Sequence, residues 1–208
     1  MPQRPTVPIV PTKGMNLTDN IREAWMQKHF RPTVAFIGVR NTDERVYEIP
    51  LVNYANGPAS QLILPQGIIK RNQSMQDAVW ELISDAFLIE RAKKGEQRYP
   101  TCLGYYDHVM QAGRAPEGFK KGKRLYFVTM DIDGMTFAWK DSRLQRDENP
   151  VVTMTFLCNL GPIRNALSSI SHEGKRWASI GMIEDALQQR FDRDCALAAK
   201  KPPIKQVA

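Results

Sequence analysis

The segment from Leu64 to Leu88, LPQGIIKRNQSMQDAVWELISDAFL, constrains the fold more than any other part of this 208-residue chain. It opens with a glycine, Gly67, where a turn is expected, and continues with apolar residues at helical spacing. Ser74 stands at an N-cap position, and Asp77 follows three residues later as in a capping box. We therefore expect a helix over 75–92 that buries one apolar side against another element, and that side consists of Met75, Val79, Leu82, Ile83, Ala86 and Ile89.

The other segments predict strands on both sides of this helix and helices at the end of the chain. Strand-like patterns rich in β-branched and apolar residues occupy 33–40, 45–54, 61–65, 101–111 and 124–133, with further segments at 135–139 and 149–160. Helical patterns occupy 16–30, 161–170 and 180–199, and Thr18 or Asp19 is placed to cap the first. This order favours a single domain of the α/β (α+β) class over a doubly wound parallel sheet, in which strands and helices alternate.

The composition is that of an ordinary globular protein and argues against several classes. Apolar residues make up 42% of the chain and charged residues 25%. The sequence has no run of about 18 apolar residues, so no membrane span is expected, and the first residues lack the apolar stretch of a signal peptide. Cys102, Cys158 and Cys195 are far apart and form no CxxC pair, which indicates neither a disulfide framework nor a zinc site. We expect a cytoplasmic location.

Three acids recur at intervals of four along the expected helix: Asp77, Glu81 and Asp85. Side chains at this spacing stand one above the next, and like charges there cost a helix roughly 0.2–0.5 kcal/mol per pair. A divalent cation would reverse the sign of that interaction, because Mg²⁺ prefers carboxylate oxygens and substrate phosphates as ligands. The alternative is a solvated helix face partnered by basic neighbours, for which the candidates are Lys70, Arg71 and Arg91.

The same segment resembles the Nudix box, G-x5-E-x7-R-E-U-x-E-E-x-G-U, where U is apolar. Gly67 matches the first glycine, and Gln73 stands where the first glutamate belongs. With one residue missing early in the helix, Trp80 replaces the arginine and Glu81 matches the glutamate that follows it. The remaining positions are then taken by Leu82, Ser84, Asp85, Phe87 and Leu88. Without that gap, Glu81 would replace the arginine and Asp85 would match the first of the last two glutamates.

The resemblance extends over roughly 33–195. The opening PQG is similar to that of Nudix enzymes that act on dinucleoside polyphosphates and on the 5′ end of RNA, and 174–191 is similar to the tryptophan and helix that end many members. The resemblance implies a single Nudix-like α/β/α sandwich with a mixed sheet over 33–199. A proline-rich arm and a helix over 1–32 would precede it, and a basic tail over 200–208 would follow.

The resemblance also implies a site. Glu81 and Asp85 would be the catalytic acids and would hold Mg²⁺ or Mn²⁺, with Asp77 as a further ligand. Gln73 and Ser84 stand where the box has glutamates, and the loss of ionic ligands lowers both metal affinity and transition-state stabilisation. Hydrolysis is therefore expected to be weakened or lost. A base from another loop could compensate, and the candidates are Asp131, Asp133 and Glu148.

A basic loop over 112–124 is the second candidate binding region, and the chain as a whole carries a net charge of +7. Its cations surround Phe119, a combination that suits phosphate contact and base stacking. The alternative is a solvated hairpin tip. The substrate-binding candidates are Gln66 and Gly67 before the helix and Arg114, Lys120, Lys121, Lys123 and Arg124 in the loop. His108 and His172 are isolated in the sequence, so we interpret each as a surface or core residue rather than a ligand.

Three functions remain open from the sequence. The first is a binding protein for a nucleoside diphosphate-containing ligand, an RNA 5′ end or another protein, with hydrolysis weakened or lost. The second is an active, metal-dependent pyrophosphohydrolase. The third is a structural or assembly protein that grips partners through its arm, since 1–14 carries several prolines and no periodic pattern.

Overall fold

The computed structural model describes residues 7–43, 46–55, 57–58, 61–87, 98–111, 113–135 and 151–199, except for the side chains of 43 and 85–87. The helices in these ranges are α1 (Leu17–Gln27), α2 (Met75–Phe87), α3 (Leu160–Leu167) and α4 (Glu173–Ala199). The strands are β1 (Val10–Pro11), β2 (Phe30–Asp43), β3 (Val46–Tyr54), β4 (Gln66–Ile68), β5 (Thr101–Val109), β6 (Gly122–Asp131) and β7 (Val151–Cys158).

The strands form one mixed sheet in the order β1-β5-β6-β2-β3-β7, and β4 also pairs with β2. β2 and β6 run parallel along ten residues of each strand, from Phe30 opposite Gly122 to Val39 opposite Asp131. The other pairings are antiparallel. The long β2 is the centre of this arrangement, because β4 and β6 pair with it and β3 continues from its end. The mixed sheet confirms the fold class predicted from the sequence.

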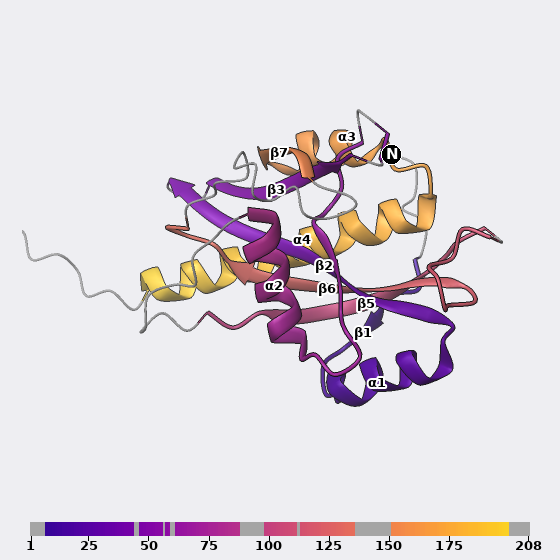
Figure 1. The fold of residues 1–208 in the computed structure, drawn as a ribbon. Helices are drawn as coiled ribbons and strands as arrows, with labels where there is room; N and C mark the ends of the chain where they lie inside the picture. The colour runs from indigo at the N-terminus through magenta and orange to yellow at the C-terminus, as the bar shows by residue number, and fades with distance from the viewer. Residues whose placement is uncertain are drawn as a thin grey trace, which may run out of the picture.

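Helices cover both faces of the sheet (Figure 1). One face of β2 and β6 packs with α1 and α2, in a core that includes Val34, Phe36, Tyr126 and Val128. The other face packs with α3 and α4, in a core that includes Leu125 and Phe127. This division follows from the strand period of two, which sends successive side chains of β6 to opposite sides. The two faces are called the α2 face and the α4 face below.

The first helix is shorter than the sequence predicted. Asn16, and not Thr18 or Asp19, caps it: the Asn16 side chain accepts a hydrogen bond from the Asp19 N–H at 3.3 Å. Lys28 ends it in the left-handed conformation, and Phe30 already belongs to β2.

Two other boundaries differ from the prediction, and the predicted end of a third element lies outside the described residues. The strand expected over 61–65 is a single bridge between Ile63 and Val52, and the strand itself is β4 at 66–68. The helix expected over 75–92 is described as far as Phe87. The last helix begins at Glu173 rather than at 180, and Gly174 in its first turn lies against Tyr106 of β5. None of the helices in the described ranges has the length and apolar character needed to cross a membrane.

Candidate ligand-binding site on the face of α2

The candidate site is built around the N-terminal half of α2 and the loop that precedes it. Ser74 caps the helix as predicted, since its hydroxyl accepts a hydrogen bond from the Asp77 N–H at 3.0 Å. The same hydroxyl donates to the Asp77 carboxylate at 2.7 Å. Asp77 is thereby committed to the first turn of the helix, where a negative charge also complements the helix dipole.

Glu81 is neutralised by the chain itself. Lys70 forms an ion pair with one carboxylate oxygen of Glu81, and the Gln73 amide donates to the other at 2.5 Å. The carbonyl oxygen of the Gln73 side chain accepts a hydrogen bond from the Lys70 N–H at 3.0 Å, so the loop and the helix are tied together. The Lys70 ammonium lowers the pKa of the Glu81 carboxyl below its ordinary value, and the Gln73 amide adds to this effect.

The described acids of this site, as they are placed here, are not arranged to hold a magnesium or manganese ion. Hard divalent cations take six or more oxygen ligands, usually including one or two carboxylates. Both oxygens of Glu81 already accept hydrogen bonds, and Asp77 is turned to Ser74. The side chain of Asp85 lies outside the described residues. Among the side chains that are described, no three of His, Cys, Asp and Glu come together as a metal site.

Gly67 has a packing role in the structure. It lies in β4 instead of the expected turn, opposite Val34. A Cβ atom placed on it would meet the side chain of Leu82 on α2 at 3.2 Å, so the glycine lets β4 and α2 pack closely. Its neighbour Gln66 is held through its backbone: its N–H donates to the Tyr54 hydroxyl at 2.8 Å, and that hydroxyl donates to its carbonyl at 3.1 Å.

The tip of the basic loop is anchored beside this segment. Lys120 and Lys121 are exposed, and their backbone N–H groups donate to the carbonyls of residues 28 and 29, each at 2.8 Å. The ring of Phe119 lies edge-on against that of Trp25, with centroids 5.1 Å apart. The Trp25 indole N–H in turn donates to the carbonyl of Ile69 at 3.0 Å, directly before Lys70. Trp25 thus connects the loop to the segment that carries the box. Arg114 is exposed in the same loop.

The last two cations predicted for this loop belong to β6 and point to opposite faces. Arg124 lies on the α2 face and pairs with both oxygens of Asp107 at 2.7 and 2.8 Å. Its guanidinium also lies 4.5 Å from the centroid of the Tyr105 ring. These contacts make Arg124 a structural residue of the sheet. Lys123 lies on the α4 face, away from the candidate site.

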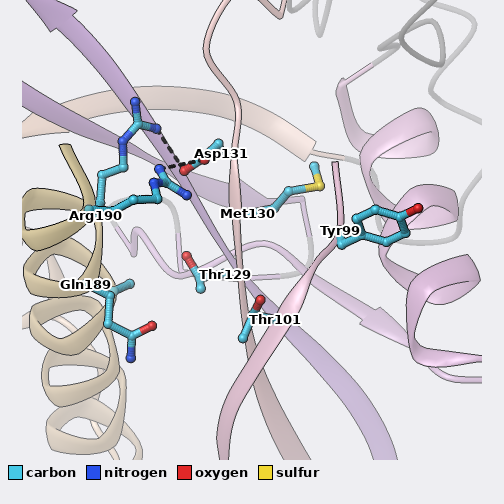
Figure 2. Close-up of a pocket in the computed structure, with 9 residues that line it drawn as sticks. Tyr99, Thr101, Thr129, Met130, Asp131, Gln189 and Arg190 are labelled. Carbon is cyan, nitrogen blue, oxygen red and sulfur yellow. Dashed lines mark hydrogen bonds and ion pairs between the residues drawn. The ribbon is translucent and has the colours of Figure 1, made fainter. Parts of the chain in front are cut away.

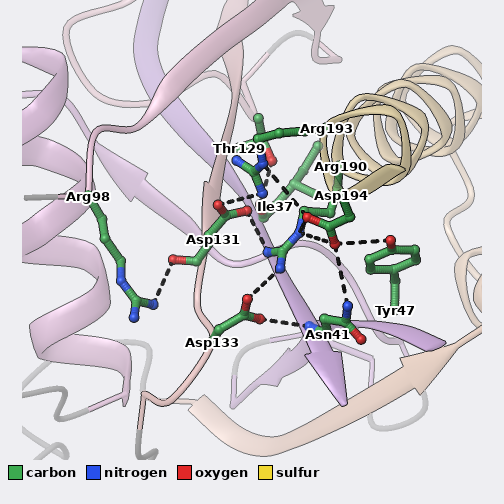
Figure 3. A network of polar contacts seen from close by, with 10 residues as sticks. All are labelled: Ile37, Asn41, Tyr47, Arg98, Thr129, Asp131, Asp133, Arg190, Arg193 and Asp194. Carbon is green, nitrogen blue, oxygen red and sulfur yellow. Dashed lines mark hydrogen bonds and ion pairs between the residues drawn. The ribbon is translucent and has the colours of Figure 1, made fainter. Parts of the chain in front are cut away.

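Asp131 and Asp133, predicted as substitute bases, are neutralised on the α4 face. Figure 3 shows both carboxylates directed at Arg190 of α4, which also pairs with Asp194. The Arg190–Asp131 distance is 2.8 Å, and the Arg190 side chain is only 8% exposed. A second arginine, Arg193, pairs with Asp131 at 2.6 Å. This network fastens α4 to the sheet. Glu148, the third candidate base, lies outside the described residues.

A small pocket beside this network was not predicted from the sequence. It has a volume of about 190 Å³ and lies between α4 and the adjoining ends of β5 and β6 (Figure 2). Ligand-binding pockets usually measure about 300–1,000 Å³, so this one is small even for a nucleotide fragment. Its lining comes from elements far apart in the chain, and no local sequence pattern signals it. The residues are Tyr99, Thr101, Thr129, Met130, Asp131, Ala186, Gln189, Arg190 and Arg193.

Comparison with known proteins identifies the fold. The sequence matches no protein-family model and no curated protein. Among solved structures, the NUDIX domain of Shewanella oneidensis NrtR, complexed with ADP-ribose, superposes with a TM-score of 0.51 at 13% identity, over 78% of this chain and 88% of that chain. A NUDIX hydrolase from Nitrosomonas europaea gives 0.47 at 18% identity, over 86% and 96% of the two chains. A C. elegans Ap4A hydrolase binary complex gives 0.46 at 12% identity, over 80% and 98%.

The chain therefore has the Nudix fold, as the resemblance in its sequence implied. The fold assignment rests on the mixed sheet between helical layers and on the superposition with the NrtR domain.

Proposed function

We propose that this protein recognises a nucleoside diphosphate-containing ligand on the α2 face and does not hydrolyse it efficiently. The observation that carries the proposal is the ion pair between Lys70 and Glu81, completed by the hydrogen bond from Gln73. Glu81 is the acid that best matches the Nudix box, and its charge is already balanced by an ammonium group. A metal ion would have to displace that ammonium before it could polarise a phosphoryl oxygen.

The residues around Glu81 support the same reading. Gln73 offers a neutral amide where the box has a glutamate, and Ser84 offers a hydroxyl. Neither replaces an ionic ligand, and fewer carboxylates give weaker stabilisation of the charge that develops on a phosphoryl group. The ligand of the NrtR domain, ADP-ribose, contains a diphosphate, and it serves here as the first ligand to test.

The basic loop is the part of the site proposed to hold the phosphates. Lys120 and Lys121 are exposed, and Arg114 adds a guanidinium that can bind two phosphate oxygens at once. The contacts from Phe119 to Trp25 and from Trp25 to Ile69 hold this loop next to the box segment. Gln66 and Gly67 are proposed to line the site through their position in β4, directly before that segment.

The test separates binding from turnover. ADP-ribose, a dinucleoside polyphosphate and 5′-triphosphorylated RNA are titrated by calorimetry in the presence of chelator, Mg²⁺ or Mn²⁺, and the mixtures are then analysed by chromatography. We expect saturable binding of one ligand in chelator and no release of products. The double variant Lys120→Met, Lys121→Met should weaken this binding, whereas Lys13→Met, which removes an exposed lysine elsewhere, should not.

Metal-dependent product release would support the alternative function, a Nudix pyrophosphohydrolase. That activity should then disappear in the double variant Glu81→Gln, Asp85→Asn. If none of the ligands binds and none is cleaved, the proposed function is wrong.

A further inference from the structure

A row of basic side chains crosses three neighbouring strands on the α4 face. His108 of β5 lies opposite Lys123 of β6, and Lys123 lies opposite Arg31 of β2. Side chains two residues apart on a strand point to the same face. The three therefore share the side of Leu125 and Ala35, which belong to the core under α4.

The first turn of α4 packs on the end of this row. The ring of His172 lies 4.4 Å from that of His108, edge-on. His172 also caps α4, because its Nδ1 accepts a hydrogen bond from the Lys175 N–H at 3.1 Å. The hydroxyl of Tyr106 lies against Gly174, where a Cβ atom would meet it at 2.3 Å, so only glycine permits this approach. These contacts place Lys175 and the N-terminal N–H groups of α4 next to His108, at one end of the row of basic side chains.

Among the described residues, no carboxylate pairs with the positive charges in this cluster. Arg31, Lys123 and Lys175 are half-buried, and none of them forms an ion pair within the described ranges. The Arg31 Nε is buried and has no hydrogen-bond partner there. Burial lowers the pKa of Lys123, with a further contribution from Arg31. Burial, together with the charge of Lys123, lowers the pKa of Lys175 to about 8.

Like charges opposite one another on neighbouring strands repel, and partial burial strengthens that repulsion. An arrangement of this kind is unfavourable by itself and becomes favourable when an anion lies among the cations. We propose that Arg31, His108, Lys123, His172 and Lys175 form a binding site for a phosphate dianion.

The donors suit this ion. The guanidinium of Arg31 and the ammonium groups of Lys123 and Lys175 form short, charge-assisted hydrogen bonds with phosphate oxygens. The neutral His172 carries its proton on Nε2, since Nδ1 is the acceptor in the cap, and can donate a further hydrogen bond. The N-terminus of α4 adds its positive dipole end. Several donors side by side favour a tetrahedral ion with many acceptor oxygens over a single carboxylate.

This site goes beyond the proposed function and does not rest on it. It lies on the α4 face, whereas Glu81 belongs to α2 and the basic loop contacts Trp25 of α1 through Phe119. Two sources could supply the dianion: free inorganic phosphate, or the monoester phosphate of a nucleotide such as AMP. Their shared chemistry defines the site, and the experiment below separates them.

The test follows the His108 imidazole by NMR in the intact chain during titration with inorganic phosphate, and separately with AMP. Burial and three neighbours, Lys175, His172 and Lys123, lower the pKa of His108 to about 4. A bound dianion favours the charged imidazole. We therefore expect phosphate to shift the His108 resonances saturably and to raise the pKa of His108 towards its ordinary value. Chloride at the same ionic strength should not do so.

Two variants give the matched comparison. Lys123→Met and Lys175→Met should each weaken phosphate binding by about 10- to 100-fold, the effect of losing one hydrogen bond to a charged group. Lys13→Met, which removes an exposed lysine outside both proposed sites, should leave it unchanged. The far-ultraviolet circular dichroism of each variant checks that it is folded. If a variant fails to fold, the pKa of His108 in the unaltered chain decides the matter.

The outcomes are distinct. Displacement of phosphate by AMP at His108 identifies a nucleotide monoester as the source, and binding of inorganic phosphate alone identifies the free ion. The proposal is wrong if phosphate leaves His108 unchanged, if chloride acts equally, or if both folded variants bind phosphate as the unaltered chain does. A failure here leaves ADP-ribose binding on the α2 face untouched, since Lys120 and Lys121 are not part of this cluster.

Discussion

The cations at the two ends of α4 differ in whether carboxylates of the described residues pair with them. Near its C-terminal end, Arg190 is almost fully buried and pairs with three carboxylates, those of Asp131, Asp133 and Asp194 (Figure 3). At its N-terminal end, Lys175 lies with other half-buried cations and has no ion pair within the described ranges. Both ends pack on the same face of the same sheet.

This difference separates structural charge from charge that is available to a ligand. The burial of an ion costs several kcal/mol of desolvation unless the ion is paired. Because carboxylates pair with Arg190, this network needs no ligand to balance its charge. Glu81 on the α2 face follows the Arg190 pattern, because Lys70 and Gln73 satisfy its carboxylate. In these regions the acids are satisfied internally and cations are left over. This distribution of charge supports the proposal that the protein binds a phosphate-containing ligand.

The largest loss of stability is expected from removing Arg190, the paired cation near the C-terminal end of α4. Arg190→Leu leaves Asp133 and Asp194 without their main cation, while Asp131 keeps Arg193, and should lower the free energy of unfolding by about 3–5 kcal/mol. Urea denaturation measures this change. Arg193→Leu is the matched control on the same helix: its side chain is 49% exposed, so its removal should cost less than about 1 kcal/mol. Equal losses of unfolding free energy in the two variants would contradict the conclusion that Arg190 stabilises the fold more than Arg193 does.

The free energy of unfolding should depend on pH through Lys175, near the N-terminal end of α4. The unfolded chain holds the Lys175 proton up to its ordinary pKa of 10.5, whereas the folded chain loses it at about 8. Between these values the unfolded state binds more protons, so the free energy of unfolding should rise with pH, by an amount on the order of 1–3 kcal/mol. Urea denaturation across this range measures the rise. Lys175→Met should flatten it, and saturating phosphate should reduce it, while an unchanged slope in the variant would contradict the assignment to Lys175.

The docking of the first turn of α4 can be tested at Gly174. Gly174→Ala places a Cβ atom 2.3 Å from the Tyr106 hydroxyl, and should cost about 1–3 kcal/mol in unfolding free energy through overpacking. Adding Tyr106→Phe removes the clashing oxygen and should recover most of the loss. Gly161→Ala in α3 meets no atom within 4 Å and should be neutral or stabilising by about 0.5–1 kcal/mol. Thermal denaturation compares the three, and a lack of rescue would show that the contact with Tyr106 is not the constraint.

The smallest effect on stability is expected at Lys70, whose side chain is 67% exposed. Lys70→Met should change the free energy of unfolding by less than about 1 kcal/mol. It should nevertheless raise the pKa of Glu81 towards its ordinary value, because the ammonium is the main cause of the lowering. A carbon-13 NMR titration of the Glu81 carboxyl measures this, with Arg71→Met as the control. The same Glu81 pKa in both variants would mean that the ion pair does not form in solution.

Much of the fold could be predicted from local patterns. The apolar spacing in 75–83 marked α2, the Ser74 cap marked its start, and the apolar run over 33–40 marked the centre of β2. The boundaries of α1 were wrong because Asn16, Thr18 and Asp19 are all residue types that cap helices, and in the structure Asn16 is the cap.

The site was harder to predict because its contacts join distant residues. Lys123 and Arg124 are adjacent in the sequence, but β6 begins at Gly122 and the strand period sends them to opposite faces. The isolated His108 and His172 meet only when β5 packs under α4. The parallel pairing of β2 with β6, which brings Arg31 next to Lys123, leaves no local trace in the sequence.

We propose above all that this protein binds a phosphate-containing ligand without needing a metal ion. Calorimetric titration with ADP-ribose in the presence of chelator, followed by chromatography of the mixture after addition of Mg²⁺ or Mn²⁺, tests it most directly. We expect saturable binding in chelator and intact ADP-ribose after incubation with either metal. Binding that requires the metal, followed by cleavage that Glu81→Gln abolishes, would contradict it.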